Sequence, residues 1–219
     1  MLKIRDDISS LPASEMADII RRLPAWRRDV VMRYRFERSR RESALAFALL
    51  QEMLLTHYGI ADDIEFAIGP HGKPALPNHP DIHFNLSHCP KAVACAVSDS
   101  PVGVDIESLG RYKDTLARHT LSPDEMQSLT ASVYPDRPHL TPAAVTDLTF
   151  TILWTKKEAL LKLIGTGITD NLPDILPAYR QKVAFDTYVN LSRGYVCTTC
   201  RHARPADCRE TLEFVDSHS

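Results

Sequence analysis

The sequence predicts an α+β protein of two pseudo-symmetric lobes, each a long helix packed on a small antiparallel sheet. Each half of the 219-residue chain contains one long helical stretch and several short strand-like runs. The hydrophobic fraction of 44% and the charged fraction of 25% are those of an ordinary soluble globular protein. We place the junction near residues 100–104, which divides the chain into lobes of residues 1–102 and 103–219.

The first lobe begins with helices. A first helical stretch covers residues 13–23 and leads into an arginine-rich segment. In residues 41–59, "RESALAFALLQEMLLTHYG", apolar side chains recur at helical spacing, and Gly59 stands where a helix stops. We therefore expect the long helix of this lobe to end at Gly59.

Short strand-like runs follow this helix and are separated by turn residues. The segment 69–80, "GPHGKPALPNHP", is rich in glycine and proline and predicts a loop. The expected strands are residues 64–68 ("IEFAI"), 82–88 ("IHFNLSH"), 92–98 ("AVACAVS") and 102–107 ("VGVDIE").

The second lobe repeats the combination of helices and strands. Ser122 is a natural N-cap for a short helix, and Pro123 is a natural first-turn residue. The prolines of residues 134–147 predict a loop. The other expected elements are helices at 114–119 and 122–130, a long helix at 148–165 ("LTFTILWTKKEALLKLIG") and strands at 182–191 and 194–199.

The formal net charge of −2 conceals a basic segment at residues 21–41, "RRLPAWRRDVVMRYRFERSRR". Such a segment is suited to nucleic acid, an anionic cofactor or an acidic protein, and it is equally typical of a solvated helix. No long apolar run occurs, and the N-terminus has acidic residues where a signal peptide is apolar. We therefore expect a cytoplasmic protein that does not enter a membrane.

The five cysteines do not predict a disulfide framework, because their number is odd and no export signal is present. Cys197 and Cys200 form a CxxC with His202 and Cys208 nearby, which is the residue set of a zinc site. Cys197 also closes the apolar run "GYVC", so the preferred interpretation is buried structural thiols.

The stretch "VGVDIE" places two carboxylates on one face of a strand. Residues two apart in a strand point to the same side, so Asp105 and Glu107 share a face with Gly103, and the three apolar residues share the other. Neighbouring like charges oppose folding unless a cation or donor compensates, and Mg²⁺ prefers such oxygen ligands. The alternative is an edge strand with a solvated polar face. Gly103 leaves room for a close approach to the backbone.

The stretch "WTKKEALLKLIGTGI" places Trp154, Glu158 and Lys162 on one face of a helix, each one turn apart. An exposed Glu–Lys pair is the common explanation and contributes only ~0.3 to 0.5 kcal/mol. The tryptophan argues against full exposure. The functional interpretation assigns Glu158 to a metal or to proton abstraction, and Lys157 and Lys162 to phosphate oxygens.

Two further stretches carry groups suited to phosphate. Lys73 lies in "GKP", in a loop whose glycines and prolines permit a tight backbone. Ser87 and His88 end the strand "HFNLSH" before a proline. Taken singly, a surface lysine and a structural histidine are the more common explanations.

Together and in this order, "GKPAL", "HFNLSHC", "VGVDIE" and "WTKKEALLKL" resemble the Sfp-like 4'-phosphopantetheinyl transferases, from about residue 20 to about residue 200. The resemblance implies that family's fold, in which coenzyme A lies between the two lobes. It implies transfer of the phosphopantetheine arm of coenzyme A to a serine of an acyl or peptidyl carrier protein, with Mg²⁺ required and 3',5'-ADP released.

The resemblance also implies roles for individual residues. The expected metal ligands are Asp105, Glu107 and Glu158, and the expected catalytic residues are Glu158 and Lys162. The expected cofactor contacts are Lys73, Ser87, His88, Lys157 and Arg41, the last at the 3'-phosphate with Arg40, Arg27 and Arg28 as alternatives. Since the attacking serine belongs to the carrier, no nucleophile is expected in this chain.

Two other functions remain as alternatives. A coenzyme A-binding partner of carrier proteins without catalysis would not need the acidic residues and Lys162. Nucleic-acid binding through the basic segment would need aromatic residues interleaved in an RNA-reading pattern, which the sequence lacks, and the net charge is slightly negative. The expected partners are thus coenzyme A and an apo carrier protein, and the expected state is a monomer. Carrier preference is not transferable, because the segment between "VGVDIE" and "WTKKEALL", residues 108–153, departs from the family pattern.

Overall fold

The computed structural model describes residues 1–61, 64–69, 71–167 and 171–215. Helices and two separate larger sheets alternate along the chain, which confirms the predicted α+β class. The elements of the first half are β1 (Leu2–Arg5), α1 (Ala13–Arg22), α2 (Ala25–Arg33), α3 (Glu37–Tyr58), β2 (Ala67–Ile68), β3 (Pro74–Ala75), β4 (His83–His88) and β5 (Val93–Ser98).

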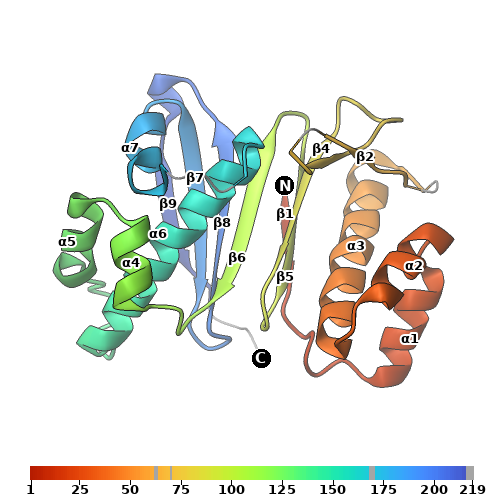
Figure 1. Cartoon of the computed structure of the whole chain (residues 1–219), viewed down its shortest axis with the longest axis horizontal. Coiled ribbons are helices and arrows are strands. Elements are labelled where there is room, and N and C mark those ends of the chain that lie inside the picture. The colour runs from red at the N-terminus through yellow and green to blue at the C-terminus, as the bar shows by residue number, and fades with distance from the viewer. Residues whose placement is uncertain (62–63, 70, 168–170, 216–219) are drawn as a thin grey trace.

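The second half forms the other large sheet and its helices (Figure 1). Its elements are β6 (Val102–Ser108), α4 (Asp114–Thr120), α5 (Pro123–Ala131), α6 (Pro142–Ile164), η1 (Leu172–Asp174), α7 (Ile175–Tyr179), β7 (Val183–Asn190), β8 (Tyr195–His202), η2 (Pro205–Asp207) and β9 (Glu210–Phe214).

Each large sheet has one long helix beside it. The first sheet has the order β1-β5-β4 and is antiparallel throughout. The second has the order β6-β8-β7-β9, in which β7 and β9 run parallel and the other pairs antiparallel. Figure 1 shows α3 beside the first sheet and α6 crossing the second, so the two halves share the predicted arrangement of helix and sheet.

The long helix α3 forms where apolar side chains recur at helical spacing. Leu45, Leu49 and Met53 are at most 3% exposed. The helix ends at Gly59, whose φ of 67° is left-handed and costs a glycine little. It begins at Glu37, four residues before the predicted start, within the arginine-rich segment.

The long helix α6 begins earlier than the sequence predicts. The Thr141 hydroxyl accepts a hydrogen bond from the Ala144 amide and caps the helix, and Pro142 occupies its first turn. The predicted loop at 134–147 is therefore wrong over its last six residues. The reason is that a first-turn proline lacks only an N–H that would be unpaired in any case, so it starts this helix instead of breaking it.

Sequence patterns also missed strands at the ends of the chain. The strand β1 pairs with β5, and β9 pairs with β7. Both are short and are stabilised by partners distant in sequence. The run 64–68 forms a strand only at its last two residues, β2.

Side chains join the two large sheets where β4 lies against β6. The Val104 amide donates to Asn85 Oδ1 at 2.8 Å, and the Ile106 amide donates to Ser87 Oγ at 3.2 Å. These bonds satisfy two edge N–H groups of β6 that β8 does not pair. The motif "FNLSH" therefore has a role that its sequence did not reveal, which is to bring the end of β4 to the carboxylate strand.

The two faces of β6 divide as the alternation predicts. Val104 and Ile106 are fully buried in a cluster with alanines of β5. The opposite face lies against α6, where a Cβ built on Gly103 would stand 2.0 Å from the Ala159 carbonyl oxygen. The close approach expected at Gly103 is thus made by the helix backbone.

The cysteines of the CxxC lie in β8 and are fully buried in two different clusters, Cys197 with β6 and Cys200 beneath α6. Within the described ranges no group of three His, Cys, Asp or Glu side chains is arranged to hold a metal. Among the same residues, no helix is both long and apolar enough to cross a membrane.

Candidate functional site

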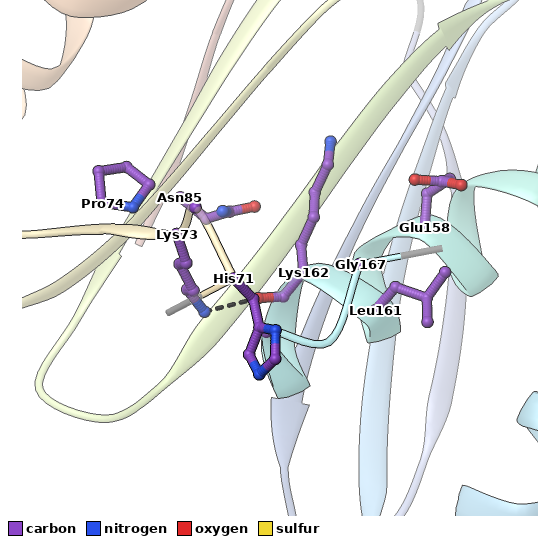
Figure 2. A pocket seen from close by; sticks show the side chains of 10 residues that line it. His71, Lys73, Pro74, Asn85, Glu158, Leu161, Lys162 and Gly167 are labelled. Carbon is purple, nitrogen blue, oxygen red and sulfur yellow. Dashed lines mark hydrogen bonds between the residues drawn. The ribbon is translucent and has the colours of Figure 1, made fainter. Parts of the chain in front are cut away.

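A cavity of about 290 Å³ lies between the loop that precedes β3 and the C-terminal half of α6 (Figure 2). Its lining comes from both halves of the chain and comprises His71, Gly72, Lys73, Pro74, Asn85, Glu158, Leu161, Lys162, Gly165 and Gly167. Three of the motifs singled out in the sequence, "GKP", "FNLSH" and "WTKKEALLK", therefore meet at one cavity.

Asp105 and Lys162 form an ion pair next to this cavity. The Lys162 ammonium donates to Asp105 Oδ1 at 2.7 Å and to the Ser87 hydroxyl at 3.0 Å. Ser87 in turn donates to Asp105 Oδ1 at 2.9 Å. Because Ser87 also accepts the Ile106 amide and is buried, its hydroxyl organises Asp105 and Lys162 and is not free for the cofactor contact that we expected.

Glu107 is held by two groups that the sequence analysis did not connect to it. Arg111 donates to Oε2 at 2.5 Å, and the Trp154 indole N–H donates to Oε1 at 3.2 Å. Burial and the charge of Asp105 raise the pKa of Glu107, while Arg111 opposes that rise. The tryptophan on the Glu158 face of α6 thus contacts the carboxylate strand.

Glu158 lines the cavity from α6. Burial raises the pKa of this carboxyl, with further contributions from the charges of Asp105 and Glu107 and opposition from Lys162. The charges of Asp105 and Glu107 both act on Glu158, so the three predicted acidic residues lie close enough to interact. Lys162 and Arg111 supply the positive charge that partly compensates them.

The donor set fits a hard divalent cation. Among the buried side-chain atoms of the described residues, Asp105 Oδ2 and Glu158 Oε1 are without a hydrogen-bond partner, although Asp105 is only 4% exposed. Carboxylate oxygens without a hydrogen-bond partner are available as ligands, and Mg²⁺ binds through carboxylate oxygens. The three carboxylates are not preassembled as a ligand group in the part of the chain described, since Lys162 and Arg111 hold two of them.

Lys73 points into the C-terminal end of α6. Its ammonium donates to the carbonyls of Lys162 at 2.6 Å, Val102 at 3.2 Å and Leu163 at 3.3 Å (Figure 2 shows the first). A lysine has three N–H donors, and three carbonyls accept them here. Lys73 therefore links the two halves at the cavity wall, and a phosphate contact would require it to release at least one of these bonds.

His88 contacts a buried glutamate, Glu42, that the sequence analysis missed. Its Nδ1 is 3.4 Å from Glu42 Oε2, and the other Glu42 oxygen accepts from Arg38 Nε at 2.7 Å. Burial lowers the pKa of His88, with Lys162 and Arg38 acting in the same direction and Glu42 opposing them. Arg38 and His88 thus share the Glu42 carboxylate, which holds the end of β4 against the start of α3.

The arginine expected at the 3'-phosphate is directed elsewhere. Arg41 donates to the carbonyls of Leu11 at 2.8 Å and Ile8 at 3.4 Å, so it fastens the N-terminal segment to α3. Arg27 donates to Ser43 and lies over the Phe47 ring. The alternatives Arg40 and Arg28 donate to nearby backbone carbonyls. Of the basic segment, the structure brings Arg38 to the His88 side of the site.

Lys157 is not at the cavity, which corrects the expected cofactor contact. It is fully buried, and its ammonium contacts Glu125 at 2.8 Å and the Leu172 carbonyl at 2.7 Å. Adjacent helical residues are rotated by about 100°, so Lys157 cannot share the face of Glu158. It instead connects α6 to the capping box of α5, to which Glu125 belongs.

We expect Lys157→Met to lower the free energy of unfolding by about 3 kcal/mol or more, because it leaves Glu125 buried without its cation. Urea unfolding measures this change. Lys156→Met is the matched control on the same helix, since Lys156 pairs with an exposed Glu210 and its loss should cost under about 1 kcal/mol. Equal costs for the two variants would contradict the assigned role of Lys157.

The acidic group also predicts a pH dependence of stability without metal. The pKa of Glu158 in the folded chain is raised above its ordinary 4.5, so the folded state binds the proton more tightly than the unfolded state. Stability from this group is present below pH 4.5 and is lost as the pH rises through the folded pKa. The free energy of unfolding in urea is measured between pH 4.5 and 7, with EDTA present to remove metal. As the pH rises, this free energy should fall less in Glu158→Gln than in the native chain. Identical slopes would contradict the raised pKa.

Comparison with known proteins gives consistent matches. A family model described as the 4'-phosphopantetheinyl transferase superfamily matches residues 101–203. A 4'-phosphopantetheinyl transferase of Bacillus subtilis is 29% identical over 83% of this chain and 75% of its own length. The transferase psf-1 of Bacillus pumilus is 34% identical over 67% of this chain and 59% of its own, and Sfp of Bacillus subtilis strain 168 is 29% identical over 65% and 60%. The chain therefore spans less than two thirds of the latter two relatives.

Proposed function

This chain belongs to the Sfp-like 4'-phosphopantetheinyl transferase family, and we propose that it catalyses that reaction on carrier proteins. The 4'-phosphopantetheine group of coenzyme A passes to a serine of an acyl or peptidyl carrier protein, and 3',5'-ADP is released in a Mg²⁺-dependent step. Coenzyme A binds between the lobe of residues 1–102 and the lobe of residues 103–219, at the cavity shared by "GKP" and α6.

One observation carries this proposal. Two buried carboxylate oxygens without a hydrogen-bond partner, one on Asp105 and one on Glu158, lie near the Lys162 ammonium. All three are beside a cavity that is lined from both halves of the chain. Negative oxygens and a lysine in one place suit a substrate that brings both a metal and phosphate groups. A protein that bound coenzyme A without catalysis would need the cationic groups but not the carboxylate oxygens that lack a hydrogen-bond partner.

Each residue has a distinct part in the reaction. As the carrier serine oxygen bonds to the β-phosphorus, the bond from that phosphorus to the oxygen of 3',5'-ADP breaks, and Glu158 takes the serine proton. Its place on the cavity wall, beside the Lys162 ammonium that follows it by one helical turn, supports this assignment. Lys162 stabilises the negative charge on the departing phosphate. When bound by Asp105, Glu107 and Glu158, Mg²⁺ supplies charge neutralisation for the diphosphate.

The direct test incubates the protein with coenzyme A, Mg²⁺ and a panel of apo acyl and peptidyl carriers, and measures the intact mass of each carrier. We expect at least one carrier to gain one phosphopantetheine arm, and its serine-to-alanine variant to gain none. The competing function, a coenzyme A-binding partner of carriers without catalysis, predicts coenzyme A binding by calorimetry with no mass change across the panel.

A further inference from the structure

Arg111 forms an ion pair with one of the three acidic residues, Glu107. It lies in the loop between β6 and α4, and its guanidinium contacts Glu107 Oε2 at 2.5 Å while stacking 5.3 Å from the centre of the Trp154 ring. Trp154 itself donates to the second Glu107 oxygen. Both oxygens of one expected metal ligand are therefore engaged by side chains of the protein.

The backbone on either side of Arg111 is held in place. The amides of Gly110 and Tyr112 donate to the two oxygens of Asp147, at 2.6 Å and 2.9 Å. The Arg111 side chain, in contrast, is 38% exposed. The guanidinium can thus leave Glu107 by rotating its side chain into solvent, with no rearrangement of the loop.

The charge of Arg111 reaches beyond its direct partner. It opposes the rise in pKa of both Glu107 and Glu158. It therefore compensates the same negative charge that a divalent cation would compensate. Two cations that neutralise one group of carboxylates compete with each other, because occupation by either reduces the field that attracts the other.

We propose that Arg111 is a built-in competitor for the metal, which occupies Glu107 in the metal-free protein and must be displaced when Mg²⁺ binds. This inference rests on the metal site of the proposed function. It gives Arg111 two consequences, a lower affinity for Mg²⁺ and a higher stability of the metal-free chain. A guanidinium with a purely structural role would produce only the second.

The test measures Mg²⁺ affinity by titration calorimetry with coenzyme A present and carrier protein absent, at constant ionic strength. We expect Arg111→Gln to bind Mg²⁺ about five- to tenfold more tightly than the native chain, the size of a partly exposed charged hydrogen bond. The matched control is Arg118→Gln, which removes the same charge from an exposed pair with Asp114 on α4. Its affinity should lie within about twofold of native.

A second readout uses the tryptophans, of which the chain has two. If Mg²⁺ displaces Arg111 as proposed, Trp154 loses the guanidinium that lies over its ring, whereas Trp26 packs against Phe47 and Phe66 in the other half. Mg²⁺ should change the emission of the native chain, and Trp154→Phe should remove that change.

Equal or weaker Mg²⁺ binding in Arg111→Gln, compared with Arg118→Gln, would overturn the competition between Arg111 and the metal. Tighter binding confined to Arg111→Gln would support it. A different result would contradict the proposed function itself, namely that the native chain binds no coenzyme A and modifies no carrier.

Discussion

Replacing Glu158 with glutamine is expected to reduce carrier modification by at least about 10²-fold, since the variant loses the proposed proton acceptor and one proposed metal-binding oxygen together. The rate is measured from the mass of the carrier over time at saturating coenzyme A. This is one of the two largest effects that the structure predicts.

The same substitution should leave stability unchanged or improved, which separates it from a folding defect. Burial and the charges of Asp105 and Glu107 already oppose ionisation of Glu158, and glutamine removes that unfavourable charge without changing the shape of the side chain. The expected pattern is therefore a lost rate with a melting temperature at or above that of the native chain.

A matched control is Glu210→Gln, which makes the same chemical change at a side chain that is 62% exposed and lies on β9, away from this cavity. It should keep the native rate within about twofold. Full activity in Glu158→Gln would remove that residue from the mechanism, whatever the result for Glu210.

Replacing Gly103 with alanine is expected to lower the free energy of unfolding by about 4 kcal/mol or more, which is exceptional for a single methyl group. The new Cβ would stand 2.0 Å from the Ala159 carbonyl oxygen and 2.7 Å from the Leu163 amide nitrogen. Both are backbone atoms of α6, so no side-chain rotation relieves the overlap and the helix must move away from the strand.

Urea unfolding and the yield of soluble protein measure this effect. Gly69→Ala is a useful comparison, because its Cβ would lie 3.2 Å from the Lys73 carbonyl oxygen in a loop. We expect Gly69→Ala to lower the free energy of unfolding by less than about 1 kcal/mol. If Gly103→Ala were as stable as Gly69→Ala, the contact between β6 and α6 described above would be wrong.

Local patterns in the sequence were sufficient for the two long helices, for the strands β4 to β8 and for part of the site. The alternation of "VGVDIE" correctly separated a buried apolar face from a face that carries Asp105 and Glu107, because side-chain direction in a strand depends on parity alone. Helical spacing placed Trp154, Glu158 and Lys162 on one face for a similar reason. The start of α6 was missed, because prolines signal both loops and first turns of helices.

Long side chains were the main source of error in the site. Lys157 and Arg41 belong to the expected residue types, yet Lys157 reaches Glu125 and Arg41 reaches the Leu11 carbonyl. A lysine or arginine can bring its charge to any of several partners around its Cα, and sequence spacing does not select among them. Arg111 and Glu42 were missed for the same reason, since their partners lie on other elements.

The sequence by itself determined the α+β class, the two long helices with their glycine ends and the carboxylate face of β6, because these depend on residues near one another along the chain. Only the tertiary structure decided which charges meet. Lys162 pairs with Asp105, Arg111 with Glu107 and Lys73 with the end of α6, across separations that no local pattern records. The physical reason is that a buried charge must find a partner wherever the packing of strands and helices leaves one within reach.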